Sequence, residues 1–250
     1  MKNENTNGIC KEIIDWLNEY ASHSIDSQSM DKNGYISPNI ILDFGEKGFF
    51  GLLTSKKHGG KELKFDDFLQ IIKAISEIDL SLAVFIAGHN IICFHLEKVL
   101  PTSSSNLLKT YSTGRKFIGM AITEEDVGSN FRGISTNAIL LDNGDWVISG
   151  KKKWAGLAAW AHEICVLAKD ENNNYMVFLM PLNTPGVKLL SKSDGMGLKA
   201  FPRNTILFNK VRLKNECILN KAPFKNGISL INSIFKLSRI TIGAMSLGVM

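Results

Sequence analysis

The stretch Gly119 to Asn130, GMAITEEDVGSN, is the part of the sequence around which the rest of the chain is organised. It starts inside an apolar strand predicted over Phe117 to Ile122, passes through Thr123 and Glu124 into an acidic turn, and ends at Gly128-Ser129-Asn130. Backbone amides, hydroxyls and a flexible glycine at a strand end can approach a flat, acceptor-rich heterocycle or a phosphate closely. The stretch therefore predicts a ligand-binding loop, and a turn stabilised by Ser and Thr is the alternative interpretation.

A second segment with the same layout follows. Gly150 to Gly156, GKKKWAG, again stands at the end of a predicted strand. Together the two segments resemble the signature of the acyl-CoA dehydrogenase family, in which a TEP-x-A-GSD loop and a later G-x-K-x-W-I-T segment line the flavin of FAD. The matching residues are Thr123, Glu124, Gly128 and Ser129 in the first segment and Gly150, Lys152 and Trp154 in the second.

Three further segments resemble the family in the expected order. Glu46 to Gly60, EKGFFGLLTSKKHGG, is similar to its G-x-x-G…P-x-x-x-GG segment. Gly195 to Leu213, GMGLKAFPRNTILFNKVRL, is similar to its G-x-R-x-S-x-T…F-x-x-V segment. Arg239 to Gly248, RITIGAMSLG, resembles the opening helix of its last domain. Each match is weak by itself, but their order across most of the chain makes the resemblance specific.

The resemblance implies an FAD site at the ends of two strands. The residues implied to bind FAD are Met120, Ile122, Thr123, Gly128, Ser129, Trp154, Ala155 and Gly156, and those implied to bind substrate are Ser129 and Arg239. Three positions depart from the family pattern. Glu125 replaces a proline, Asn130 replaces an aspartate, and Gly156 stands where the family has a threonine that hydrogen-bonds flavin N5. With that hydroxyl gone, a backbone amide is the donor that this position can still offer.

The later match departs from the pattern as well. Lys199 replaces an arginine, which keeps the charge but loses the bidentate geometry. Phe201 and Arg203 replace a serine and a threonine. Arg203 suits a phosphate of CoA or phosphopantetheine, and the alternative is a solvated charge beside a strand.

The sequence assigns no catalytic residue. Desaturation of an acyl thioester needs a carboxylate beside the α-carbon with a pKa raised by burial. The family places this glutamate far down its last domain, or immediately before the arginine matched by Arg239, where this chain has Ser238. Glu163 and Glu216 lie elsewhere in the pattern, so neither is assigned as the base.

Composition narrows the functional classes. The 250 residues carry a formal charge of +5, and no Lys/Arg run is longer than Lys151 to Lys153, which argues against nucleic acid. The four cysteines lack metal or C-x-x-C spacing, and we expect reduced thiols, three of them in the core. The five histidines are scattered, so no metal site is predicted. Leu80 to Leu100 is apolar but contains His89, Asn90 and His95, which argues against a membrane span.

The fold class predicted is α+β, with three parts. Residues 1–113 are expected to form an all-helical domain, with helices over 9–22, from Asp66, and over Leu80 to Val99, and with a polar loop over Asp26 to Pro38. Residues 114–222 are expected to form a small antiparallel β-barrel or sandwich, because seven short apolar segments alternate with turn-forming residues. The predicted strands are Phe117–Ile122, Ile134–Leu141, Trp146–Ser149, Ile164–Ala168, Tyr175–Met180, Val187–Leu190 and Thr205–Phe208.

Residues 223–250 are expected to form the first helix of a truncated C-terminal helical bundle. This helix begins near Gly227 and stays apolar as far as Met250. Its apolar face either packs against the barrel, or is covered by another chain, or indicates that the sequence is a fragment.

We expect an FAD-dependent acyl-thioester dehydrogenase, or a split component of one, that acts on a thioester of CoA or of an acyl carrier protein. The electron acceptor would be an electron-transfer flavoprotein or oxygen. The alternatives are a non-catalytic protein of the same fold that docks an acyl carrier, and a flavin monooxygenase. The N-terminus lacks a signal peptide, so a cytoplasmic homo-oligomer, or a complex with a chain that supplies the missing helices, is expected.

Overall fold

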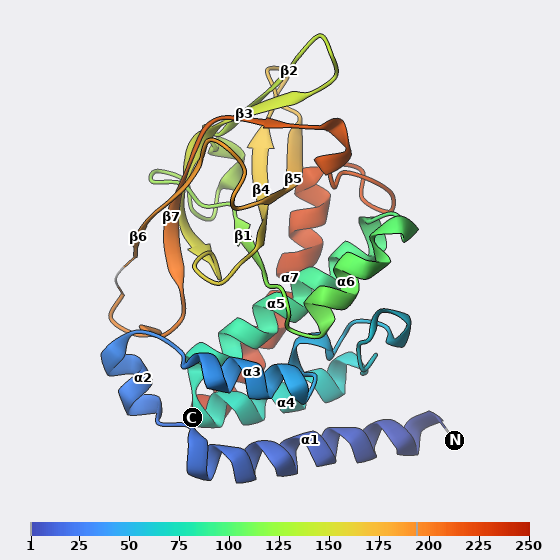
Figure 1. The fold of residues 1–250 in the computed structure, drawn as a ribbon, viewed down its shortest axis with the longest axis vertical. Coiled ribbons are helices and arrows are strands. Elements are labelled where there is room, and N and C mark those ends of the chain that lie inside the picture. Colours follow the sequence, from blue (N-terminus) through green and yellow to red (C-terminus); the bar gives the residue numbers. More distant parts are fainter. Residues whose placement is uncertain (1, 194) are drawn as a thin grey trace.

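The computed structural model describes residues 2–193 and 195–250, with side chains from residue 8 onward. A helical layer occupies one end of the molecule and a seven-stranded sheet the other (Figure 1). The helices of the first part are α1 (Lys2–Ser24), α2 (Ser27–Asn33), α3 (Pro38–Glu46), α4 (Phe65–Ile78), α5 (Leu80–Val99) and α6 (Ser105–Ser112), with 3-10 turns η1 (Phe49–Gly51), η2 (Lys56–His58) and η3 (Thr102–Ser104). The strands are β1 (Ile118–Ala121), β2 (Asn137–Leu140), β3 (Trp146–Gly156), β4 (Glu163–Lys169), β5 (Tyr175–Pro181), β6 (Val187–Lys192) and β7 (Arg203–Leu213), with η4 (Phe131–Gly133), η5 (Asn215–Cys217) and a last helix, α7 (Gly227–Val249).

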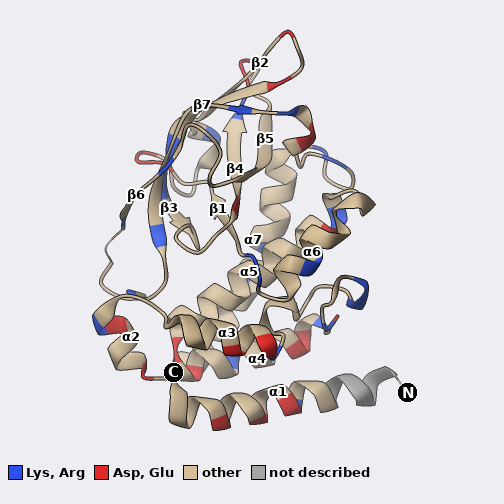
Figure 2. Ribbon diagram, viewed as in Figure 1, with Lys and Arg blue, Asp and Glu red and all other residues tan. Residues whose placement is uncertain are grey.

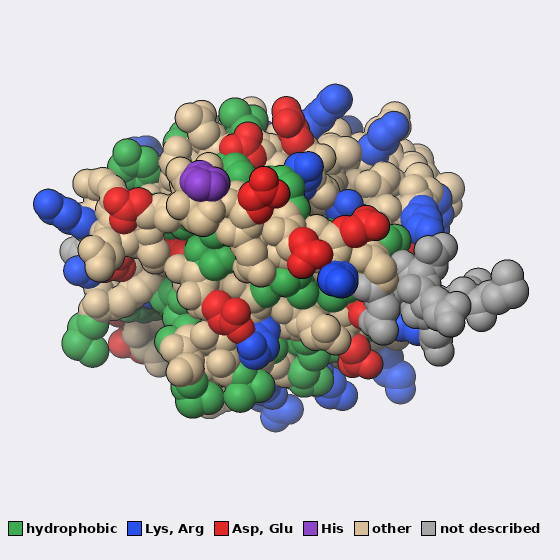
Figure 3. All heavy atoms as spheres, turned by 90° about the horizontal axis from the view of Figure 1, so that it is seen from below, with side chains coloured by type: hydrophobic (Ala, Val, Ile, Leu, Met, Phe, Trp, Pro, Cys, Tyr) green, Lys and Arg blue, Asp and Glu red, His purple; other side chains and the backbone are tan. Residues whose placement is uncertain are grey.

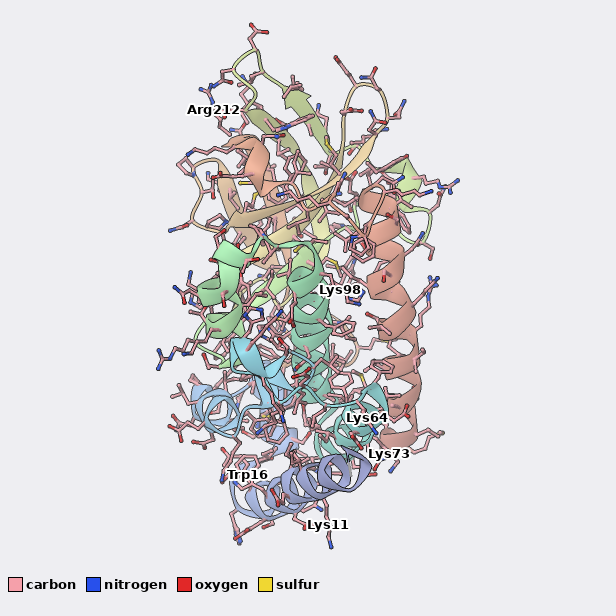
Figure 4. All side chains as sticks on the ribbon, turned by 90° about the vertical axis from the view of Figure 1, so that its right-hand side faces the viewer. Lys11, Trp16, Lys64, Lys73, Lys98 and Arg212 are labelled. Atoms are coloured by element: carbon pink, nitrogen blue, oxygen red, sulfur yellow. The ribbon has the colours of Figure 1, made fainter. Side chains whose placement is uncertain are left out.

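Aromatic side chains form much of the helical core. Trp16 of α1 stacks on Tyr20 and meets Phe44 of α3 edge-on, with ring centroids 4.8 and 5.6 Å apart (Figure 4). Phe44 in turn packs against Phe49, and both are fully buried. Edge-to-face arrangements of this kind stabilise a core beyond the area that they bury. The helical character predicted for this part of the chain is confirmed.

Helix α5 runs through the centre of the molecule. The side chain of Asp79 caps its first turn by accepting a hydrogen bond from the amide of Leu82 at 2.7 Å. By length and composition, α5 is the one helix among the described residues that is able to cross a membrane, and 72% of its most apolar window is buried inside the protein. His89, Asn90 and His95, which interrupt its apolar sequence, are buried and hydrogen-bonded within the fold. The helix is therefore packed as a core helix.

Helix α2 corrects the loop predicted over Asp26 to Pro38. Asp26 caps the helix by accepting from the amide of Ser29, and Gly34 ends it with φ +72°, a left-handed conformation that suits glycine. Lys192, in β6, donates to the carbonyl of Gly34. The polar sequence hid this helix because its length of seven residues is too short to show a helical period.

All seven predicted strands are present, in one sheet of order β1-β4-β2-β3-β7-β6, with β5 paired to β4 and β1 paired also to β3. The expectation of an antiparallel β-barrel or sandwich needs one correction. β1 and β4 pair in parallel, from Ile118 opposite Glu163 to Ala121 opposite Val166. β2 also pairs with β4 in parallel, through Asn137 at the start of β2 and Lys169 at the end of β4. Parallel neighbours require a long crossover, and here the chain between β1 and β4 supplies it as β2 and β3.

Helix α7 rests on α4 and α5, and its first turn lies beside β5 (Figures 1 and 4). Asn226 and Ser229 form a reciprocal capping box at its start. The side chains on its inner face are buried: Leu230, Ile231, Ile234, Thr241 and Met245. The outer side chains Ile240, Ile242, Leu247, Val249 and Met250 are more than half exposed. The predicted apolar face is thus covered by helices on one side and open on the other.

The charged residues are dispersed, and the four cysteines are free thiols. Acidic and basic residues are spread over both the helices and the strands (Figure 2), and on the face shown in Figure 3 they are intermingled with hydrophobic side chains. Cys10, Cys93 and Cys165 are buried free thiols and Cys217 is half-buried, as expected. Among the described residues, no group of three His, Cys, Asp or Glu side chains is arranged to hold a metal ion.

Candidate functional site

A cleft of about 240 Å³ lies where the ends of β1 and β3 meet α5 and α7. Five residues expected to bind FAD line it together: Met120, Ile122, Thr123, Trp154 and Gly156. Its remaining walls are apolar, and they come from Val84, Gly88 and Ile92 of α5, Phe235 of α7, and Leu157 and Phe201. The two sequence segments singled out for their strand-end position therefore form one cleft.

Three other residues expected to bind FAD lie outside this cleft. The side chain of Ala155 points into the core of the sheet and is 1% exposed. Gly128 and Ser129 stand on an exposed part of the loop after β1. Arg239, expected to bind substrate, is exposed on α7 with its guanidinium 5.9 Å from the ring of Phe235. Arg239 therefore lies near a residue that lines the cleft but does not line the cleft itself.

Trp154 has a backbone conformation that is rare for a side chain of its size. Its φ of +56° lies in the left-handed region, and its side chain is 47% exposed, which leaves part of the indole open. The guanidinium of Arg203 lies 5.7 Å from the indole centroid and donates to the carbonyls of Gly197 and Leu198. Arg203 therefore supports Trp154 through a cation–π contact.

A buried ion pair joins the two strand ends. Lys152, on β3, is 0% exposed, and its Nζ donates to the carbonyl of Ile122 and to Oε1 of Glu124, each at 2.9 Å. Glu124 also accepts from the amides and hydroxyls of Ser135 and Thr136 at 2.6 to 3.0 Å. Both oxygens of the carboxylate thus accept hydrogen bonds from the protein, and the residue is buried.

This environment keeps both groups charged at neutral pH. Burial raises the pKa of Glu124, but the hydrogen bonds from Ser135, Thr136 and Lys152 outweigh it and lower that pKa to about 2. Burial lowers the pKa of Lys152 to about 8, against the opposite influence of Glu124. The sequence contained a signal for this pair that the family match obscured. That signal is the even spacing of Ile148 and Lys152, which strand alternation places on one face; the structure shows both side chains fully buried.

Hydrogen-bond donors are available on Thr123, which lines the cleft, and on the exposed loop that follows it. Within residues 2–193 and 195–250, the hydroxyls of Thr123 and Ser129 and the amides of Gly128 and Ser129 donate no hydrogen bond. A Cβ at Gly128 would have no atom within 4 Å, so that part of the loop can be approached closely. Apolar walls, a partly open indole and unused donors together fit an isoalloxazine ring.

An apolar groove of about 640 Å³ adjoins the cleft along α5 and α7. Val84 and Gly88 line both the cleft and the groove. Ser238, at the position where the family can place its base, also lines the groove and donates to the carbonyl of Ile234. The lining of neither hollow contains an Asp or Glu side chain from the described residues. Glu163 instead pairs with Lys116 at 2.9 Å.

Comparison with known proteins agrees with this geometry. The model of the acyl-CoA dehydrogenase N-terminal domain matches residues 10–99, and that of the middle domain matches residues 119–211. The chain belongs to the acyl-CoA dehydrogenase family. The resemblance read from the sequence is therefore confirmed.

Among the family members, the cyclohexane-1-carbonyl-CoA dehydrogenase of Syntrophus aciditrophicus is 27% identical over 235 residues, which are 88% of this chain and 58% of that protein. The structure of butyryl-CoA dehydrogenase from Megasphaera elsdenii superposes with a TM-score of 0.88 at 18% identity, over 96% of this chain and 65% of that one. A glutaryl-CoA dehydrogenase from Mycobacterium smegmatis, in complex with FADH2, gives a TM-score of 0.87 at 20% identity, over 98% of this chain and 62% of that one. The chain thus spans less than two thirds of each of these relatives.

Proposed function

We propose that this chain binds FAD and an acyl thioester in the manner of an acyl-thioester dehydrogenase, as the part of the catalytic unit that holds the flavin edge and the acyl chain. The observation that carries the proposal is the meeting of Ile122, Thr123 and Trp154 in one cleft that opens into an apolar groove. When bound, FAD supplies the acceptor for a hydride from the β-carbon of the substrate.

The residues of the chain have separate tasks in this proposal. Trp154 offers its open indole to the ring, and the apolar walls of the cleft exclude water from it. Thr123, Gly128 and Ser129 offer hydrogen-bond donors to the acceptor atoms of the cofactor. The groove between α5 and α7 takes the acyl chain, for which its apolar lining is suited.

The proton acceptor is proposed to come from outside these residues, because neither hollow is lined by a carboxylate among the described residues. A helical partner, from another chain or from a second copy, would cover the open apolar side of α7 and bring that group. Other parts of the proposal are the use of CoA or an acyl carrier protein, an electron-transfer flavoprotein or oxygen as acceptor, and a cytoplasmic location.

The direct test is titration of the purified chain with FAD, followed by flavin fluorescence. We expect saturable binding, and we expect Trp154→Ala to weaken it by about tenfold, because a lost aromatic contact is worth on the order of 1 kcal/mol. Trp16→Phe, far from the cleft in α1, serves as the control and should leave the affinity unchanged. A chain that takes up no FAD would contradict the proposal.

Gly88 provides a test of the acyl path. A Cβ at this position would meet a single atom, Leu157 Cδ1 at 4.0 Å, so the wild-type passage between the cleft and the groove is open there. We expect Gly88→Phe to fill the passage and to weaken binding of long-chain acyl-CoA at least tenfold, with little effect on acetyl-CoA. Calorimetry on the two ligands measures this split.

Gly243→Phe, on the exposed side of α7, is the matched control and should change neither affinity. Equal losses for the two ligands in Gly88→Phe would show that the groove does not hold the acyl chain.

The second candidate is a non-catalytic protein of the same fold that docks an acyl carrier. Among the described residues no carboxylate lines the cleft, and Gly156 stands in place of a hydroxyl-bearing residue; both observations favour this candidate. Turnover of an acyl thioester with an electron-accepting dye would eliminate this candidate. Oxygen-dependent hydroxylation of a substrate would instead identify the third candidate, a flavin monooxygenase.

A further inference from the structure

Lys152 stands out among the described residues as a lysine with a completely buried side chain. It is flanked on β3 by Lys151 and Lys153, which point the other way and pair with Glu125 at the surface. Burial of an ammonium group is costly, and a buried ion pair is often no more stable than apolar residues of the same size. Stability alone therefore does not explain why an ion pair, and not two apolar residues, stands at this place.

The contacts of the pair indicate what it determines. Lys152 Nζ holds the carbonyl of Ile122, the last residue before Thr123, and the carbonyl of Thr123 accepts from the amide of Lys153 at 2.8 Å. Glu124 fixes the chain that leads into β2 through Ser135 and Thr136. Trp154 follows Lys152 by two residues, in its left-handed conformation. Three segments are thus joined at one ammonium–carboxylate contact directly behind the cleft.

We propose that Lys152 is a positioning residue, whose buried positive charge sets the position of Trp154 relative to Thr123 and so determines how tightly the cleft binds a flavin. The statement about flavin affinity rests on the proposed function. The statement about the position of Trp154 concerns the protein without a cofactor. Lys152 acts through Glu124 and the carbonyl of Ile122 and does not line the cleft.

The proposal implies a dependence on pH. Glu124 is the one titratable group that influences Lys152 in the described structure, and its charge persists throughout the neutral and alkaline range. Across the sheet, Lys152 faces Ile206 of β7, and Thr136 lies before β2, so neither of these elements adds a charge at this point. The surface carboxylate of Glu125 is engaged by Lys151 and Lys153. Because burial lowers the pKa of Lys152 to about 8, its charge is lost as the pH rises through that value.

The experiment uses the protein labelled with 5-fluorotryptophan and observed by fluorine NMR without cofactor. The chain has four tryptophans, and Trp154→Phe assigns the resonance of Trp154. In the wild type we expect this resonance to titrate with a midpoint near pH 8. In Lys152→Met we expect a displaced resonance without that titration. In Glu124→Gln the carboxylate that favours the charged lysine is gone, and the midpoint should move below 8.

Lys151→Met is the matched control, because it removes the neighbouring, exposed lysine from the same strand. It should keep both the resonance position and the midpoint of the wild type. FAD affinity is then measured on the wild type, Lys152→Met, Glu124→Gln and Lys151→Met, and we expect Lys152→Met to weaken it at least tenfold at pH 7 while Lys151→Met does not. The wild-type affinity should also fall between pH 7 and pH 9.

The outcomes separate the positioning role of Lys152 from flavin binding. A wild type that binds no FAD but shows the Trp154 titration contradicts the proposed function and leaves the positioning role supported. A Trp154 resonance in Lys152→Met that matches the wild type overturns the positioning role, whatever the flavin does. If Lys152→Met does not fold, the midpoint in Glu124→Gln decides, and an unchanged midpoint overturns the proposal.

Discussion

Acidification from pH 5 to pH 2 is expected to narrow the stability difference between the wild type and Glu124→Gln by as much as about 3 kcal/mol. The pKa of Glu124 is lowered from 4.5 to about 2 in the folded protein. A carboxylate with a depressed pKa contributes stability that is fully present above its unfolded value and is lost as the pH falls through its folded value. The window of this loss is therefore pH 4.5 to 2. Urea denaturation of both proteins across that range measures it.

Glu125→Gln is the control for this prediction, since Glu125 lies one residue away and is exposed to solvent. The stability difference between the wild type and Glu125→Gln should show no comparable change with pH. If the gap for Glu124→Gln were constant from pH 5 to pH 2, the pKa of this carboxyl would be the same in the folded and the unfolded protein, and the buried contacts would not favour its charged form.

Replacing two glycines of α7 by alanine is expected to change stability in opposite directions. A Cβ at Gly248 would lie 2.0 Å from Ser76 Oγ and 2.4 Å from the carbonyl of Lys73, both in α4. Gly248→Ala should therefore destabilise the protein by about 1 to 3 kcal/mol through overpacking. Gly243, on the exposed side of the same helix, has no atom within 4 Å of its Cβ position. Gly243→Ala should stabilise by up to about 1 kcal/mol, because alanine is the better helix former.

Chemical denaturation of the two variants beside the wild type checks the signs, and the difference between the variants is the quantity of interest. It reports the close contact of α7 with α4 alone, because helix propensity is common to both substitutions. Equal and positive effects on stability would mean that α7 does not rest on α4 in solution.

The sheet was predictable because its turns carry strong local signals. Asp142-Asn143-Gly144-Asp145 separates β2 from β3, and Gly144 adopts φ +84° there, a conformation that few other residues accept. The apolar runs between such turns have the length of strands. The pairing of the strands was harder to predict, because local residues do not indicate which strand lies beside β4. The parallel contact of β4 with β1 depends on the order of all the strands in the sheet.

Within the candidate site, the sequence indicated the two loops but not what holds them together. Met120, Ile122, Thr123, Trp154 and Gly156 line one cleft, whereas Ala155 faces the core because an irregularity in the pairing of β3 with β7 between Lys152 and Ala155 shifts the alternation of β3 by one residue. The roles of these residues toward a flavin remain predictions. Arg203 was weighed as a phosphate ligand, and the structure places it on the indole of Trp154, a contact between β3 and β7 that sequence separation conceals.

The parallel pairing of β1 with β4 also has a consequence for how the protein is made. β1 carries Met120, a wall of the cleft, yet it hydrogen-bonds to β3 and β4, which follow it in the chain. During synthesis the ribosome must therefore release the chain as far as Lys169 before this strand has its neighbours. Until then the segment Phe117 to Ile122 has only the helical part to pack against, where Phe117 meets Phe50 and Phe85, and its strand edges remain unpaired in the nascent polypeptide.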